Sequence, residues 1–124
     1  MKKLFIAILI MAGVFGLYKL MSTNPSNSGV SDDIAELTVF WGEGCPHCEK
    51  VKDYIKDNQI DSKVKIAFKE VYYNKTNQQI LEEAVKKCPE IDTQQGVGVP
   101  LAVVKATNQC LYGDQPIIDW LSRK

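Results

Sequence analysis

The stretch LTVFWGEGCPHC, residues 37–48, decides how this chain folds. Residues 37–41 are almost wholly apolar, which is typical of a central strand that is buried on both faces. Two glycines then break the strand, and Pro46 suits the first position of a helix. The pattern therefore predicts a strand, a turn and a helix, with two thiols, Cys45 and Cys48, on the first helical turn.

The position of the two thiols suits thiol–disulfide exchange. The start of a helix stabilises a thiolate, because its N–H groups lack helical partners and the helix dipole favours negative charge. Cys48 falls on one helical face with Val51 and Ile55, so we expect Cys48 to point inward and Cys45 to be exposed. Cys45 is then the sulfur that attacks or is attacked, and Cys48 resolves. We expect His47 to stabilise the Cys45 thiolate, by charge or by a hydrogen bond, which would make the pair a better oxidant.

The composition fits one small domain and gives no sign of nucleic-acid binding. The chain has 124 residues, with 15 basic and 15 acidic side chains, so its net charge is zero. No basic surface favours nucleic acid, and the length suits a single domain. The four cysteines are Cys45, Cys48, Cys88 and Cys110. An even count suits an oxidising compartment, provided that the chain is exported.

The N-terminal segment, residues 1–21, predicts export. Lys2 and Lys3 precede residues 4–18, which carry no charge. This block is shorter than the roughly 20 residues of a full span, but Lys19 can reach the interface and extend it. The positive-inside rule then gives a signal anchor in the cell membrane, with its N-terminus inside and the domain extracytoplasmic. A cleaved signal peptide and a secreted domain are the alternative.

The rest of the chain predicts a flexible linker, residues 22–32, and an α/β domain, residues 33–124. The linker is polar and rich in turn formers. The domain reads as βαβαββα. After the first strand and helix we expect an edge strand over 64–69, a helix opened by a capping box at Thr76 and ended by Pro89, a strand over 101–104, a hairpin into 109–112, and a helix capped by Asp114.

These features together resemble the thioredoxin superfamily. Residues 40–45 are similar to the run that leads from strand to active site, and Val99-Pro100 matches the position of the family's cis-proline. The short chain is closest to glutaredoxins, which have a four-stranded mixed sheet, whereas Pro46-His47 and the valine before the late proline resemble the DsbA family of disulfide oxidants. The resemblance implies that Pro100 flanks the disulfide and that the Val99 backbone pairs with an extended substrate peptide.

The chain departs from these families at three positions. Val39 stands where thioredoxins carry a buried acid, so that proton acceptor is absent. His47 occupies a position that is usually aromatic in glutaredoxins. The Gly-Gly turn that glutaredoxins use for glutathione is represented here by residues 112–114, which contain one glycine.

The second cysteine pair has two interpretations. Cys88 lies on the apolar face of a predicted helix and Cys110 lies in a short predicted strand. They form a structural disulfide if the domain is exported, or they are two buried thiols. The bond requires Cα atoms about 4.4–6.8 Å apart, and the chain-entropy model gives it about 3 kcal/mol of stabilisation.

The sequence as a whole predicts a membrane-anchored, extracytoplasmic thiol–disulfide oxidoreductase. Its expected partners are protein thiols and disulfides, a redox partner and the membrane, and both the oxidase and the reductase directions stay open. The redox-active Cys45–Cys48 disulfide takes the place of a cofactor. The site residues are Cys45 and Cys48, supported by Pro46, His47, Val99 and Pro100.

Two other functions stay open for the CXXC pair. One is a redox-inactive binding module on a thioredoxin fold, in which the Cys45–Cys48 disulfide is purely structural. The other is a metal carrier, in which the pair forms half of a zinc site. We expect no metal site, because the remaining ligands would be His47, Cys88 or Cys110, at unsuitable spacing.

Overall fold

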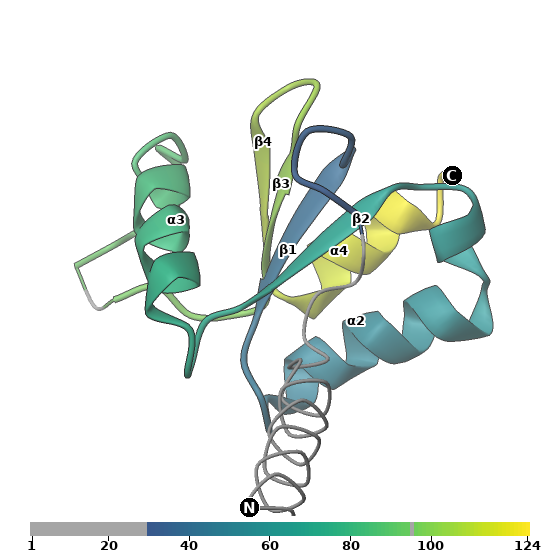
Figure 1. The fold of residues 1–124 in the computed structure, drawn as a ribbon, viewed down its shortest axis with the longest axis horizontal. Coiled ribbons are helices and arrows are strands. Elements are labelled where there is room, and N and C mark those ends of the chain that lie inside the picture. Colours follow the sequence, from purple (N-terminus) through teal and green to yellow (C-terminus); the bar gives the residue numbers. More distant parts are fainter. Residues whose placement is uncertain (1–29, 95) are drawn as a thin grey trace, which may run out of the picture.

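The computed structural model describes residues 30–94 and 96–124. These residues form an α/β fold with a mixed four-stranded sheet, and the described part contains three α-helices (Figure 1). The predicted order βαβαββα is confirmed, with one added 3-10 turn. The elements are β1 (Leu37–Trp41), α2 (Pro46–Asp57), η1 (Ile60–Ser62), β2 (Ile66–Glu70), α3 (Lys75–Val85), β3 (Leu101–Val104), β4 (Gln109–Tyr112) and α4 (Asp114–Leu121).

The predicted anchor, residues 1–21, and most of the predicted linker lie outside the described residues. Within the described part, no helix is both long and apolar enough to cross a membrane. Asp32, the last residue of the predicted linker, forms an ion pair with Lys69 of β2 at 2.8 Å. The Asp32 carbonyl also accepts a hydrogen bond from the Lys105 ammonium at 2.7 Å, so the chain is attached to the sheet at this point.

The central strand of the sheet is β1, as the apolar run predicts. The strand order is β2-β1-β3-β4, with β1 parallel to β2 and antiparallel to β3. Leu37 and Val39 face one hydrophobic core and Phe40 faces the other, which explains why the run has few polar positions. The predicted edge strand is β2. It begins at Ile66 rather than Val64, because the Val64 N–H donates to the Ile60 carbonyl in the turn after η1 (2.9 Å).

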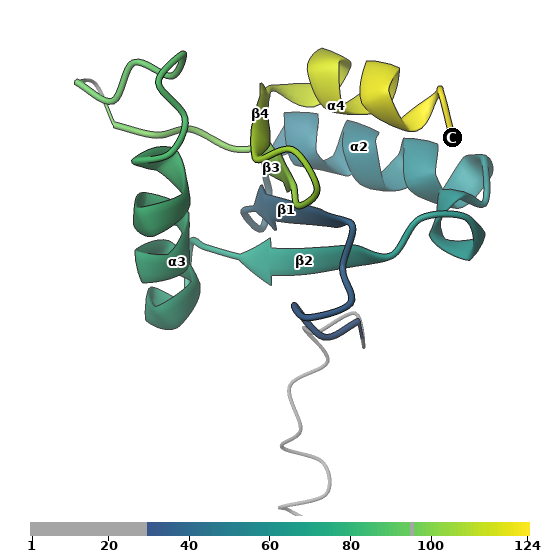
Figure 2. The same ribbon diagram turned by 90° about the horizontal axis from the view of Figure 1, so that it is seen from above.

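Helices lie on both sides of this sheet. Figure 2 shows α2 and α4 side by side over one face of the sheet. Helix α3 lies beyond the end of β2, on the side of the opposite face. The core under α2 and α4 contains Val51, Ile55, Ile117, Trp120 and Leu121, and the core under α3 contains Phe40, Val71, Leu81, Val85 and Leu101. The connection from β1 to α2, the connection from β2 to α3 and the segment that leads into β3 all lie at the same end of the sheet (Figure 1).

Helix α3 begins and ends differently from the prediction. The proposed cap at Thr76 is wrong, because the Asn74 side chain caps the helix by accepting from the Asn77 N–H at 3.1 Å. Asparagine is a preferred N-cap, and this one stands two residues earlier. The helix also ends at Val85 rather than at Pro89. The Cys88 N–H already bonds to the carbonyl three residues back (2.9 Å), which tightens the turn and stops the helix.

Helix α4 also begins without the predicted cap. Asp114 lies inside the helix, and the capping residue is Gly113, whose φ of 91° suits glycine. The prediction failed because the Asp114 carboxylate is occupied elsewhere. It contacts His47 and Lys50 of α2, and so it links the two helices on this face of the sheet.

The second cysteine pair connects α3 to the far edge of the sheet. Cys88 follows α3, Cys110 lies in β4, and the two form a disulfide with Cα atoms 5.8 Å apart. This distance falls within the range that a disulfide requires. The bond holds the end of α3 against strand β4, which is paired on one side only.

Candidate active site

The Cys45–Cys48 disulfide lies where β1 leads into α2. The Cα atoms are 5.3 Å apart. Cys45 is the N-cap of α2, and the Cys48 backbone N–H points at its Sγ at 3.2 Å. Once the disulfide is reduced, the same N–H and the helix dipole favour a thiolate on Cys45. A CXXC pair held in this way is compatible with redox activity.

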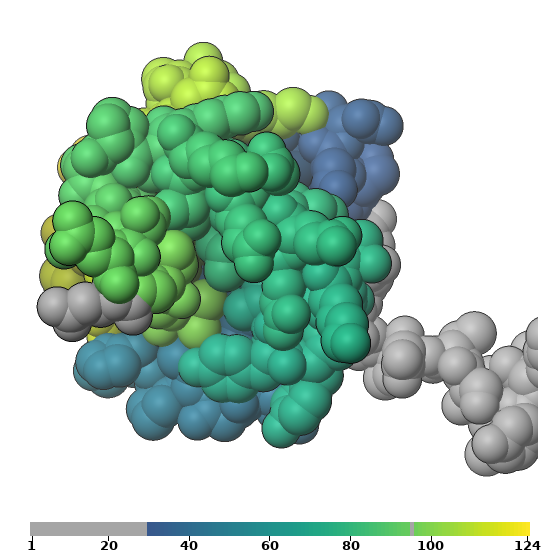
Figure 3. All heavy atoms as spheres, turned by 90° about the vertical axis from the view of Figure 1, so that its left-hand side faces the viewer, coloured from purple at the N-terminus to yellow at the C-terminus, as the bar shows by residue number. Residues whose placement is uncertain are grey.

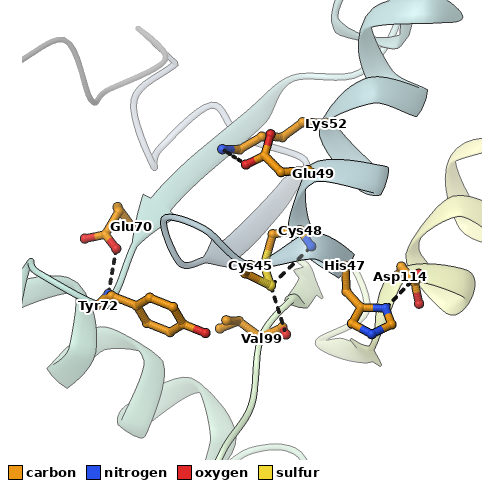
Figure 4. Close-up of a disulfide and its surroundings, with 9 residues drawn as sticks. All are labelled: Cys45, His47, Cys48, Glu49, Lys52, Glu70, Tyr72, Val99 and Asp114. Carbon is orange, nitrogen blue, oxygen red and sulfur yellow. Dashed lines mark hydrogen bonds and ion pairs between the residues drawn. A yellow bond between two sulfur atoms is a disulfide. The ribbon is translucent and has the colours of Figure 1, made fainter.

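Cys45 is less exposed than predicted. It is 7% exposed and Cys48 is 2% exposed, so the prediction of an exposed Cys45 is wrong. Helical periodicity cannot detect the cause, which is a segment from elsewhere in the chain. The Val99 carbonyl oxygen lies 3.5 Å from the Cys45 Sγ, and Figure 4 shows Val99 directly beside the sulfur, with the Tyr72 hydroxyl nearby. Cys45 is still the more exposed of the two residues.

The Val99-Pro100 dipeptide brings the Val99 carbonyl to the site. Its peptide bond is cis, and Pro100 lies immediately before β3, which pairs with the end of β1. Within the described part of the chain, the N–H groups of residues 97–99 donate to no backbone carbonyl. This short segment therefore presents backbone groups next to Cys45.

A groove runs beside this segment, between α3 and the chain that follows it. Its volume is about 770 Å³. Figure 3 shows this face, with α3 and the brighter green segment after it side by side and blue atoms of the α2 region along the lower edge. The apolar lining includes Val71, Leu81, Val85, Ile91, Val97 and Val99. The groove shares Val99 with the surroundings of the disulfide.

His47 is directed away from the cysteine sulfurs. Its side chain is 62% exposed, and Nδ1 lies 3.0 Å from the Asp114 carboxylate (Figure 4). The Lys50 ammonium lies 3.2 Å from the same carboxylate oxygen. The His47 hydrogen bond and the Lys50 ammonium lower the pKa of Asp114 to about 2, against a smaller opposing effect of burial. Of the two expected actions of His47 on Cys45, the direct hydrogen bond is not formed in this structure, where Nδ1 is bonded to Asp114 instead.

Glu70 is a buried carboxylate next to the site. It is not among the site residues predicted from the sequence. It is 8% exposed and ends β2. It accepts hydrogen bonds from the backbone N–H groups of Tyr72 (2.7 Å), Tyr73 (2.9 Å) and Asn74 (3.2 Å). Burial raises the pKa of Glu70, but these three bonds and one from the Glu43 backbone outweigh it and hold the pKa below its usual value. The carboxylate therefore fixes the loop after β2 and, through Glu43, the loop that leads to Cys45.

Removing the charge of Glu70 should destabilise the fold. We expect Glu70→Gln to lower the free energy of unfolding by about 1–3 kcal/mol at pH 7, because charge-assisted hydrogen bonds to buried N–H groups are weakened. The folded pKa is depressed, so the carboxylate contributes fully above its ordinary pKa of 4.5, and the contribution is lost as the pH falls through the folded pKa. Urea unfolding of both proteins at a series of pH values measures this difference.

The exposed Glu90→Gln variant is the control and should unfold like the wild type. The difference between wild type and Glu70→Gln should narrow as the pH falls below 4.5. A difference that stays constant down to pH 2 would show that the Glu70 charge contributes nothing.

No cluster suitable for a metal ion occurs in residues 30–94 and 96–124, where no three His, Cys, Asp or Glu side chains come together in such an arrangement. The four cysteines are paired with one another in two disulfides.

Comparisons with known proteins give no relative to guide the interpretation. The chain matches no protein-family model, no curated protein and no solved structure. What its own residues establish is a small α/β domain with a mixed four-stranded sheet and a Cys45–Cys48 CXXC pair. This arrangement is compatible with a thioredoxin-like fold.

Proposed function

We propose that this chain is a thiol–disulfide oxidoreductase of the thioredoxin superfamily, acting on proteins through Cys45 and Cys48. The observation that carries the proposal is the position of Cys45. Its sulfur caps α2, accepts a hydrogen bond from the Cys48 backbone N–H, and lies beside the Val99 carbonyl. A purely structural disulfide needs neither a position at a helix start nor a neighbouring backbone segment such as residues 97–99.

In the oxidising direction, a substrate thiolate attacks the Cys45 Sγ. A new disulfide forms between substrate and Cys45, the Cys45–Cys48 bond breaks, and Cys48 leaves as a thiolate that takes up a proton. A second substrate thiolate then attacks the substrate sulfur of this mixed disulfide and releases the Cys45 thiolate. The substrate loses two electrons and the CXXC pair gains them, after which a redox partner restores the disulfide. The reducing direction is the reverse sequence.

The helix start acts on the departing Cys45 thiolate. A thiolate that receives a backbone N–H and lies at the positive end of a helix dipole is a better leaving group, so release of the oxidised substrate is faster. In the same way, it makes the reduced state more stable and the disulfide more oxidising. Cys48, which is almost fully buried, is protected from intermolecular attack and is suited to the resolving step.

The substrate is an extended polypeptide segment that contains cysteine. The N–H groups of residues 97–99 can pair with such a segment by strand addition, which brings its cysteine to the sulfur beside Val99. The apolar groove next to these residues gives room for neighbouring substrate side chains.

The domain acts outside the cytoplasm, anchored by residues 1–21. Support comes from Lys2 and Lys3 before the uncharged block, and from the Cys88–Cys110 disulfide, since such bonds persist mainly in oxidising compartments. A reporter that is active only outside the cytoplasm, fused after Lys124, should be active. The fusion protein should be recovered in the membrane fraction. Full-length protein that is recovered in the cytosol would contradict this location, and a shortened protein in the medium would favour the secreted form.

An exchange assay tests the proposed activity. The full-length chain should accelerate the reduction of insulin disulfides by a small dithiol well above the rate without protein. A redox-inactive binding module would leave the uncatalysed rate unchanged, and a metal carrier would also contain stoichiometric metal after purification. Either of these results would remove the oxidoreductase assignment.

A further inference from the structure

Two charged side chains and His47 meet beside the first turn of α2. The Asp114 carboxylate lies 3.0 Å from His47 Nδ1 and 3.2 Å from the Lys50 ammonium. His47 lies between the two cysteines in the sequence, whereas Asp114 belongs to α4. Asp114 is only 22% exposed, so its carboxylate is held more firmly than a free surface side chain. Its pKa of about 2 keeps it ionised throughout the pH range in which thiols exchange.

This arrangement fixes the direction of the His47 ring. An ionised carboxylate accepts only, so Nδ1 must donate to it. The bond turns the ring toward α4 and away from the Cys45 sulfur, as Figure 4 shows. His47 lies between the two cysteines in the sequence, so turning the ring away removes one possible side-chain donor to a thiolate on Cys45.

We propose that Asp114 is a positioning residue that holds His47 away from Cys45 and thereby keeps the CXXC disulfide less oxidising than its Pro-His sequence allows. The proposal rests on the proposed function. A Cys45 thiolate without an imidazole donor is less stable, which makes the reduced form less stable and lowers the reduction potential. Asp114 thus adjusts the direction of exchange through a contact between two helices.

The other charged groups nearby leave the sign of this effect unchanged. On α2, Glu49 is paired with Lys52 at 3.1 Å, and on α4, Asp119 is bonded to Gln115 at 2.8 Å. If Asp114 loses its charge, the ammonium of Lys50, near the start of α2, loses its carboxylate partner. The region becomes more positive while His47 becomes free to turn, and both changes favour the thiolate.

The test compares Asp114→Asn with Asp119→Asn in the full-length chain. Both variants remove one negative charge from α4, but only the first removes the contact with His47. In Asp114→Asn, we expect the Cys45 thiolate to form at lower pH, and the equilibrium with glutathione to shift roughly two- to fivefold toward reduced protein. Thiolate absorbance and alkylation of Cys45 in glutathione buffers measure these effects, and Asp119→Asn should resemble the wild type in both.

A double variant separates positioning from a direct effect of the carboxylate charge. In a His47→Ala background, Asp114→Asn should shift the glutathione equilibrium much less than in the wild type. An unchanged or lowered potential in Asp114→Asn, or an equal shift with and without His47, would overturn the proposal. Failure of the proposed function would look different, because the wild type itself would then show no exchange.

Discussion

Replacing Cys45 with serine should reduce the rate of insulin disulfide exchange by roughly a thousandfold or more, which is typical of losing a catalytic nucleophile. Cys45 is the more exposed residue of the CXXC pair, caps α2 and lies beside Val99. A serine hydroxyl at this position cannot form or break a disulfide, and Cys48 is too buried to take over. The exchange rate of the full-length variant, compared with wild type, measures the effect.

Cys48→Ser is the matched variant, because it keeps the attacking sulfur and removes the resolving one. It should accumulate mixed disulfides with substrate proteins. These are adducts of higher mass that a reductant cleaves. Near-wild-type exchange in Cys45→Ser, or adducts that form equally in both variants, would contradict the assignment of the two roles.

Replacing both Cys88 and Cys110 with alanine should lower the stability of the domain by about 3 kcal/mol. The disulfide joins residues that are 22 positions apart and holds α3 against β4, so its loss enlarges the unfolded ensemble. For a domain of this size, the melting temperature should fall by roughly 10–20 °C. Thermal unfolding followed by circular dichroism measures the change.

The same double variant should keep its exchange activity at temperatures where it is folded. Cys88 and Cys110 are bonded to each other rather than to Cys45 or Cys48, and neither residue belongs to α2. An unchanged melting temperature would show that the Cys88–Cys110 bond is not structural. Loss of exchange in the folded variant would show that the second pair takes part in electron transfer.

The parts of the fold that the sequence predicts well are those with local signals. The central strand follows from five consecutive residues that suit burial on both faces, and α2 follows from Pro46 and the apolar spacing after it. The cap of α3 was misplaced by two residues, because Asn74 and Thr76 both suit a cap, and only the geometry of the loop after Glu70 decides between them. The order of elements does not depend on such details.

The candidate site also contains features that the sequence predicts and features that depend on contacts between distant segments. The resemblance to the thioredoxin superfamily predicts that Val99 and Pro100 reach the disulfide. The structure places Val99 beside Cys45. The same contact made the predicted exposure of Cys45 wrong, since its cover comes from a segment far away in the sequence. The Asp114–His47 contact and the buried Glu70 also depend on which loops meet at the end of the sheet. A glutamate that ends a strand before a tyrosine-rich loop was the only available signal for Glu70.

The redox equilibrium of Cys45 and Cys48 tests the central claim most directly. The full-length protein is equilibrated in buffers of defined potential, and the thiols are then alkylated and located by mass spectrometry. If the pair performs exchange, it should titrate reversibly between about −270 mV and about −120 mV, the range of thioredoxin-fold oxidoreductases, while Cys88 and Cys110 stay bonded. A Cys45–Cys48 disulfide that resists reduction until below about −300 mV would be a structural bond, and the proposed function would be wrong.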